Sequence, residues 1–257
     1  MPAPLKLITI SISHYVEKVK WALALSGLAY AEESHIPGLH ALATLWHTRG
    51  SHRATPVLID GSLVVPDSTA ILRHLSTKYA QKWLYPNAQV IELEERFDRN
   101  IGPHTRRYIY QQLFENDLSI ADLFSQGNVP QWEIVLLRLM APAIKEGMIR
   151  DMAIHPRAAE NSRLIFEREF AFVAEQLRDG RRYLCGDALT AADITFAALS
   201  APVLLPDNYG ARLPRLEQAA KDSAIHAIVD RYRTMPAGQF ALQLYREHRP
   251  QQASKNY

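Results

Sequence analysis

The hydrophobic pattern divides the chain into two unlike parts. Before residue 83, short apolar runs such as 7–10 and 57–59 alternate with the segment 13–30, whose apolar residues recur at helical spacing. This alternation is typical of an α/β layer. After residue 90 the strand signals fade and amphipathic runs follow one another, which predicts an all-α second part.

Five helical runs are expected in the second part, at 89–118, 132–149, 161–177, 194–205 and 224–232. Gly102-Pro103 should bend or break the first run, and Pro142 should kink the second. The almost wholly apolar run at 194–205 is expected at the centre of the helical domain. We therefore predict an α/β domain at 1–82, a linker at 83–90, a helical domain at 91–245 and a polar tail at 246–257.

The segment 55–75 carries the most specific pattern of the chain. An apolar strand is followed by the hairpin dipeptide Asp60-Gly61, a returning strand and a helix opened by Asp67 and Ser68. A helix N-terminus attracts a carboxylate, whereas Asp67 attracts an ammonium group. This corner can therefore bind both ends of an amino-acid head group. A hairpin followed by an ordinary capped helix explains the same pattern equally well.

Three segments in order resemble the cytosolic glutathione S-transferases. The segment 55–75 is similar to the glutathione-binding half of that family's first domain. The segment 13–30, SHYVEKVKWALALSGLAY, resembles its catalytic loop and first helix, and 183–204 resembles its late structural motif, with a capping box at Thr190 and Asp193. The resemblance implies a thioredoxin-like N-terminal domain with a mixed four-stranded sheet, an all-helical bundle as the C-terminal domain, and a homodimer.

The resemblance also implies which residues bind glutathione. Pro56 would be cis, and the backbone of Thr55 would pair with the cysteinyl part of glutathione. Asp67 and Ser68 would hold the γ-glutamyl group. Many relatives carry Lys or Gln two residues before the proline, where this chain has Ala54.

The partner of the glycyl carboxylate is therefore open. Arg53 and His52 are candidates, although either can equally be a solvated loop charge, and His40, His47 and Arg49 lie in the same region. The histidine pairs of this region are five residues apart, which does not align two ligands on one helical face, so no metal site is expected.

The implied chemistry is activation of the glutathione thiol, whose pKa is near that of free cysteine, about 8.5. A hydroxyl donor and a helix N-terminus both favour the thiolate, and each pKa unit requires about 1.4 kcal/mol. Ser13 lies six residues before Val19, where serine-type relatives carry their catalytic serine. The alternative is that Ser13 only caps the helix through Val16. Ser11 is a weaker second candidate.

The pocket for the second substrate is expected between the first loop and the helices that open the second part. Its candidate residues are His14, Tyr15, Tyr108 and Gln111, followed by Tyr110, Phe114, Leu118, Trp132 and Leu136. Such a stripe at helical spacing is more often core than pocket. His14 stands where many relatives have proline, and the region 116–160 either caps or widens the site.

Composition and charge exclude several classes of function. The net charge of +2 is too small to imply a nucleic-acid partner, and no apolar run approaches the length of a membrane span. The start, MPAPLKLITI, does not read as a signal peptide. The single cysteine, Cys185, rules out an internal disulfide and suits a reducing, cytoplasmic compartment. A mixed disulfide with the protein's own thiol is not expected, because no cysteine stands near the site.

We therefore expect a cytoplasmic, homodimeric transferase of the detoxification type. It would use glutathione as co-substrate and no metal, with Ser13 stabilising the thiolate that attacks a small electrophile. Two alternatives stay open. One is glutathione-dependent disulfide reduction in which glutathione supplies both thiols. The other is a non-catalytic fold kept for binding apolar ligands or partners.

Overall fold

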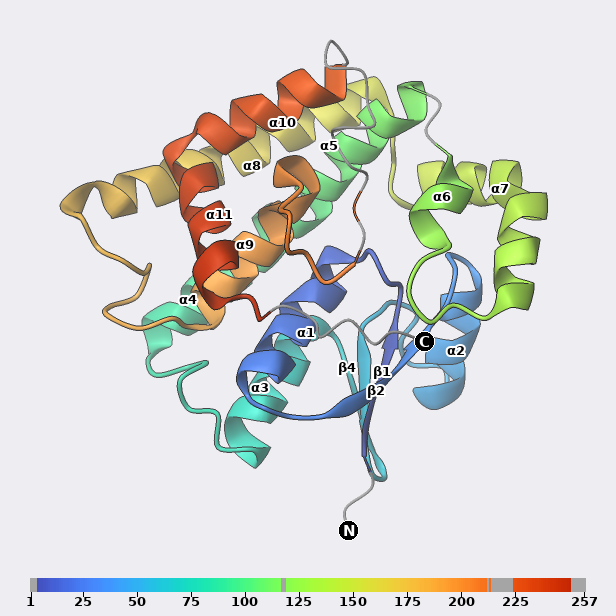
Figure 1. Cartoon of the computed structure of the whole chain (residues 1–257), viewed down its shortest axis with the longest axis horizontal. Coiled ribbons are helices and arrows are strands. Elements are labelled where there is room, and N and C mark those ends of the chain that lie inside the picture. The colour runs from blue at the N-terminus through green and yellow to red at the C-terminus, as the bar shows by residue number, and fades with distance from the viewer. Residues whose placement is uncertain (1–3, 117–118, 212, 214–223, 251–257) are drawn as a thin grey trace.

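The computed structural model describes residues 4–116, 119–211, 213 and 224–250 (Figure 1). Its first part is a four-stranded sheet with the strand order β2-β1-β3-β4 and three helices. The strands are β1 (Leu5–Thr9), β2 (Tyr30–Ser34), β3 (Val57–Asp60) and β4 (Leu63–Pro66), and the helices are α1 (His14–Leu25), α2 (Leu39–His47) and α3 (Ser68–Lys78).

The sheet is mixed, as expected. β1 runs parallel to β2 and antiparallel to β3, with Leu7 opposite Leu58, and β3 forms a hairpin with β4. Leu7, Ile8, Val57 and Leu58 are fully buried in the two central strands, because helices cover the sheet. This arrangement confirms the predicted thioredoxin-like fold class.

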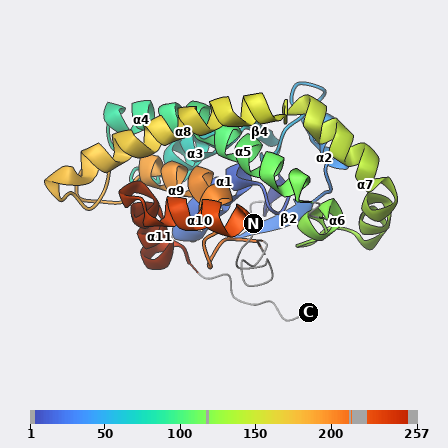
Figure 2. The ribbon, with the colours of Figure 1, turned by 90° about the horizontal axis from the view of Figure 1, so that it is seen from above.

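The second part is helical. Its helices are α4 (Ala88–Asn100), α5 (Gly102–Glu115), α6 (Ile120–Phe124), α7 (Gln131–Asp151), α8 (Pro156–Gln176), α9 (Ala191–Leu204), α10 (Ala224–Thr234) and α11 (Pro236–His248). Figure 2 shows the long α8 along one side of this bundle, with α9, α10 and α11 on the other side. Every residue of α9 except Pro202 is buried, so the apolar run forms the centre of the bundle, as predicted.

The predicted break at Gly102-Pro103 is confirmed. α4 ends at Asn100 and α5 begins at Gly102. A Cβ atom at position 102 would lie 2.1 Å from the hydroxyl oxygen of Tyr15, so any larger residue here would displace the Tyr15 side chain. The helix pair therefore turns where the first and second parts of the chain touch.

The C-terminal end of the fold differs from the prediction of a polar tail from residue 246. α11 continues to His248, and the side chain of Arg249 is buried against Glu17 of α1. Trp21 also donates a hydrogen bond to the carbonyl of His248 at 3.0 Å. Residues 246–249 therefore belong to the fold, and 251–257 lie outside the described residues. α4 likewise begins at Ala88, inside the predicted linker.

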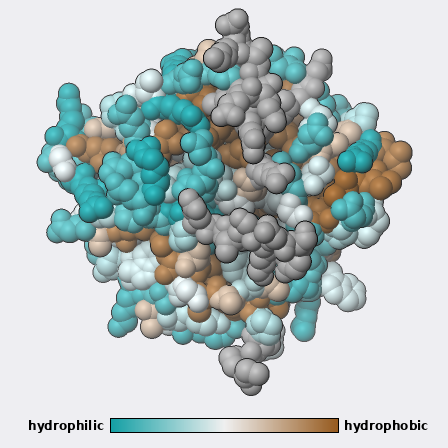
Figure 3. Space-filling view, viewed as in Figure 1, coloured by the Kyte–Doolittle hydropathy of each residue, from teal (hydrophilic) through white to brown (hydrophobic). Residues whose placement is uncertain are grey.

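Several large apolar side chains of α7 remain exposed. Trp132, Val135 and Leu139 are 62%, 55% and 76% exposed, and Figure 3 shows hydrophobic surface gathered over α7. Within the described ranges, no helix combines the length and the apolar character that crossing a membrane requires.

Candidate functional site

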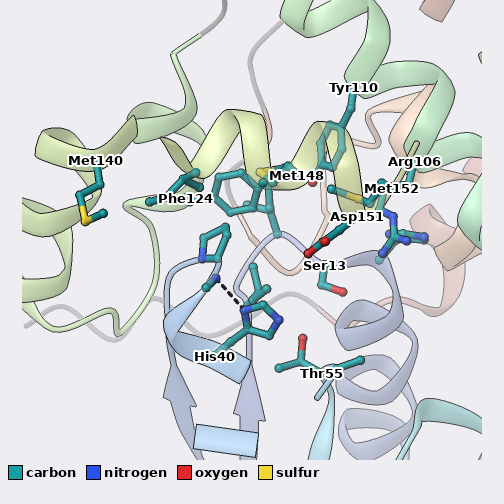
Figure 4. Close-up of a pocket in the computed structure, with 18 of the residues that line it drawn as sticks. Ser13, His40, Thr55, Arg106, Tyr110, Phe124, Met140, Met148, Asp151 and Met152 are labelled. Atoms are coloured by element: carbon teal, nitrogen blue, oxygen red, sulfur yellow. Dashed lines mark hydrogen bonds between the residues drawn. The ribbon is translucent and has the colours of Figure 1, made fainter. Parts of the chain in front are cut away.

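A cavity of about 530 Å³ lies between the two parts of the chain (Figure 4). One wall comes from the first part: Ile10, Ile12, Ser13, His14, Pro37, Gly38, His40, Ala54 and Thr55. The other wall comes from α5, α6 and α7 and the residue that follows: Arg106, Tyr110, Phe124, Met140, Ala143, Ile144, Gly147, Met148, Asp151 and Met152. Of the predicted site residues, Ser13, His14 and Thr55 thus meet at one cavity.

Ser13 is the N-cap residue of α1, but its side chain does not cap the helix. Its backbone is extended, with φ −67° and ψ 125°, and its carbonyl accepts from Glu17 N at 2.9 Å. Within the described residues, its hydroxyl group makes no capping hydrogen bond. The alternative that Ser13 serves only as a cap is therefore wrong. Its hydroxyl group faces the cavity beside a positive helix end.

Two other hydroxyl groups near the start of α1, those of Ser11 and Tyr15, are bonded elsewhere. Ser11 is buried and donates to the carbonyl of Gln126 at 2.8 Å, which ties the end of β1 to the segment after α6. Tyr15 donates to the carbonyl of Asp98 at 3.2 Å and is not among the residues that line the cavity. Tyr15 therefore joins α1 to α4, which corrects its assignment to the substrate pocket.

His14 lines the cavity as a neutral imidazole. Its Nε2 atom lies 2.8 Å from the carbonyl oxygen of Gly102, so this nitrogen carries the proton and donates it. Burial, followed by the nearby charge of Arg106, lowers the pKa of His14 to about 3. The ring therefore adds a hydrogen bond between α1 and α5 but no charge.

The Thr55–Pro56 peptide bond is cis, as the resemblance implies. Thr55 lines the cavity and precedes β3, and no backbone hydrogen bond of Thr55 is found within the described ranges. Its backbone groups are thus available to an added extended segment. Asp67 N donates to the carbonyl of Pro56 at 3.2 Å, which places the start of α3 beside this corner.

Asp67 and Ser68 have features that an ordinary capped helix does not require. Asp67 adopts φ 75° and ψ 138°, a strained region for a residue with a Cβ atom. One oxygen of its carboxylate accepts from Thr69 N at 2.9 Å and Ala70 N at 3.1 Å. The Oγ atom of Ser68 is buried and has no hydrogen-bond partner among the described residues. Strain and an unpaired buried hydroxyl group together indicate a ligand site.

A buried ion pair lies beneath the start of α3. Lys18 Nζ contacts Glu94, Asp98 Oδ1 at 2.9 Å and Thr69 Oγ1 at 3.1 Å, and the side chains of Lys18 and Glu94 are fully buried. Thr69 also donates to Glu94 at 2.7 Å. This network joins α1, α3 and α4 and fixes the first turn of α3. Lys18 lies in the segment 13–30 that carries the resemblance, but the resemblance gives it no role.

Two predicted pocket residues lie in the helical core instead. Tyr108 packs against Phe166 and Tyr232, with ring centroids 5.6 and 6.2 Å apart. Gln111 is buried and donates to Glu115 at 2.7 Å. These residues face α8 and α10 or their own helix, whereas Arg106 and Tyr110 face the cavity. Of the further candidates only Tyr110 lines the cavity, and Leu118 lies outside the described residues.

Arg53 is exposed and does not line the cavity. His40 lines it instead: its Nδ1 atom accepts from Gly38 N at 3.1 Å, which leaves the proton on Nε2 (Figure 4). Burial lowers the pKa of His40 to about 4. Arg106 and Asp151 also line the cavity and were missed by sequence reasoning, because nothing in the pattern shows which face of a helix meets the first part of the chain.

Comparisons with known proteins agree with this geometry. Residues 7–83 match the family model described as glutathione S-transferase, N-terminal domain. No curated protein matches the chain. A solved glutathione transferase from Phanerochaete chrysosporium, GSTFuA3, is 18% identical and superimposes with a TM-score of 0.62 over 98% of this chain and 100% of its own.

Two further solved structures have the same fold. A glutathione S-transferase of Ceriporiopsis subvermispora in complex with glutathione is 16% identical, with a TM-score of 0.58 over 94% of this chain and 95% of its own. The beta-etherase LigF from Sphingobium sp. strain SYK-6 is 16% identical, with a TM-score of 0.57 over 94% of this chain and 99% of its own. The fold is therefore that of glutathione transferases. Residues 7–83 also match that family's N-terminal domain.

Proposed function

We propose that this protein is a glutathione transferase in which Ser13 stabilises the thiolate of bound glutathione. The observation that carries the proposal is the hydroxyl group of Ser13, which is not used as a cap and faces a cavity beside Thr55. The similar structure from Ceriporiopsis subvermispora contains glutathione, which supports glutathione as the ligand.

Each end of glutathione has a matching group at the cavity or beside it: Asp67 and Ser68 do not line the cavity but open α3 next to the Thr55–Pro56 corner. The γ-glutamyl carboxylate would accept from the unpaired hydroxyl group of Ser68 and from the N-terminus of α3, and its ammonium group would meet Asp67. The cysteinyl backbone would pair with Thr55. For the glycyl carboxylate we propose His40 in place of Arg53, because its Nε2–H group can donate at the cavity wall.

Stabilisation of the negative charge on the glutathione sulfur would activate the thiol. A hydrogen bond from Ser13 to a thiolate is worth about 1.5–3 kcal/mol, which lowers the thiol pKa by about one to two units. The thiol proton leaves to solvent. The sulfur attacks an electrophilic carbon in the cavity, a C–S bond forms, and the leaving group departs with its electron pair.

Substitution of Ser13 tests this role. The Ser13→Ala variant should still bind glutathione in calorimetry, but the pKa of the bound thiol should rise by about one to two units, followed by thiolate absorbance against pH. Ser11→Ala is the matched control, because its hydroxyl group is held by Gln126, and it should leave that pKa unchanged. An unchanged titration in Ser13→Ala would refute the catalytic role. Absence of any binding heat at millimolar glutathione would refute the whole proposal.

A panel of an aryl halide, an organic hydroperoxide and a mixed disulfide separates the remaining reaction types. Disulfide reduction would need glutathione for both thiols, since Cys185 does not line the cavity and burial raises its pKa to about 11. Inertness towards all three reagents, together with glutathione binding, would favour a binding protein. The homodimer, the cytoplasmic location and the division of the chain at 83–90 are parts of the same proposal, and sedimentation analysis tests the first.

A further inference from the structure

We propose that Arg106 binds an anionic group of the second substrate, so that the cavity selects flat apolar electrophiles that carry a carboxylate or a similar oxyanion. This inference rests on the proposed transferase function and deepens it. Arg106 lines the cavity from α5 and has no ion-pair partner within the described ranges. Its Nε atom is buried and lacks a hydrogen-bond partner among the same residues.

An unpaired guanidinium N–H group in a buried position is unfavourable unless something binds to it. The neighbouring arginine shows the usual solution: Arg107 donates to the carbonyl of Met152 at 2.7 Å and to Ser162 at 2.9 Å. In the part of the chain that the structure describes, Arg106 has no such partners, and it faces the cavity near Ser13 (Figure 4). A carboxylate matches the planar fork of arginine in shape and charge.

The rest of the lining defines the body of the substrate. Tyr110, Phe124, Met148 and Met152 supply aromatic rings and adaptable thioether chains on the same wall as Arg106. A cavity of about 530 Å³ has the size of a small-molecule site. An aromatic ring with one anionic substituent therefore fits both the apolar wall and the cation.

The other ionisable groups that line the cavity do not cancel the preference for an anionic substrate. His14 and His40 are neutral near pH 7, because burial lowers their pKa values to about 3 and about 4. Among the described residues that line the cavity, Asp151 carries the carboxylate, and its position is exposed, so water and salt screen its repulsion. The half-charge at the start of α1 adds to the attraction for an anion.

A matched pair of electrophiles tests the inference. Glutathione thiolate displaces chloride from both 4-chloro-3-nitrobenzoate and the uncharged 4-chloro-3-nitrobenzamide. The readout is the ratio of kcat/KM for the benzoate to kcat/KM for the benzamide. In Arg106→Met this ratio should fall about 10- to 100-fold. Arg99→Met removes the same charge from an exposed position on α4 and should keep the wild-type ratio. Arg106→Lys should restore part of it.

Two further measurements distinguish anion binding by Arg106 from a purely structural role. The melting temperature of Arg106→Met should be unchanged or higher, because an unpaired buried donor is removed; a large fall would show a structural role and overturn the inference. Calorimetry with 3-nitrobenzoate and 3-nitrobenzamide, which lack a leaving group, tests anion binding even without turnover. Equal losses for both electrophiles, with a raised thiol pKa, would assign Arg106 to the thiolate instead. Glutathione binding heat tests the transferase proposal separately.

Discussion

Asp67 combines three physical effects that substitutions can separate. Its backbone is strained at φ 75°, one carboxylate oxygen caps α3, and its charge is proposed to meet the ammonium group of glutathione. Asp67→Asn keeps the cap and the backbone strain but removes the charge. Asp67→Ala removes the cap and the charge and keeps the strain. Asp67→Gly removes all three.

The magnitudes predict an order of stability. Loss of the cap costs about 1 kcal/mol for alanine and a few tenths for glycine. Relief of the strained backbone contributes about 1–3 kcal/mol in favour of glycine, offset by about 0.4–1 kcal/mol of extra freedom in the unfolded chain. Asp67→Gly should therefore be as stable as the wild type or up to about 2 kcal/mol more stable, while Asp67→Ala should lose about 1 kcal/mol.

Glutathione affinity should follow a different order. Replacing a charge-assisted contact by a neutral one weakens binding by about 1 kcal/mol, so Asp67→Asn should raise the Kd about five- to tenfold. Asp67→Gly and Asp67→Ala should weaken binding further. Urea unfolding gives the stabilities and calorimetry gives the Kd values. The reasoning fails if glycine destabilises as much as alanine, or if all three variants bind glutathione like the wild type.

Two further predictions concern buried ionisable groups. The pKa of His14 is lowered from 6.5 to about 3 in the folded protein. As the pH falls below 6.5, His14 is therefore protonated in the unfolded chain but stays neutral in the folded protein, which favours unfolding. Urea unfolding should show a loss of about 2 kcal/mol between pH 7.5 and 5 that is absent from His14→Gln, and equal losses in both proteins would contradict this. Arg249→Ala should cost about 3–5 kcal/mol in unfolding free energy, because it leaves Glu17 buried without its partner at 2.7 Å. The pair Glu17→Gln with Arg249→Met should recover most of that loss, and a loss below about 1 kcal/mol in Arg249→Ala would show that the ion pair is dispensable.

Local chemistry explains why much of the fold was predictable. The capping box of Thr190 and Asp193 is present, with the side chain of Asp193 accepting from Thr190 N at 2.9 Å. The hairpin and the break at Gly102 likewise depend on residues that are adjacent in sequence, whereas the cis bond at Pro56 was expected only from the family resemblance. Such features need no knowledge of distant packing.

The lining of the cavity depends on distant packing and could not be predicted in the same way. Tyr108 and Tyr110 are two residues apart on α5, yet Tyr108 packs in the helical core and Tyr110 lines the cavity. Their sequence context does not distinguish them, because aromatic residues suit both environments. α6 has five residues, which is too short for a helical period to be recognised.

The helix that follows Ser13 shows why the sequence did not predict that charged residues near the C-terminal end belong to the fold. α1 buries Glu17, Lys18 and Lys20 as well as its apolar face. Each charge has a partner on a different element: Glu17 pairs with Arg249, Lys18 with Glu94, and Lys20 with Glu32 of β2 at 3.0 Å. Breaking a buried pair by removing one partner is strongly destabilising, so these pairs oppose any shift of α1 relative to the sheet, to α4 or to the C-terminal segment. The hydroxyl group of Ser13 is therefore positioned by contacts with the whole fold, and changes in the C-terminal segment at Arg249 should reach the cavity through this helix.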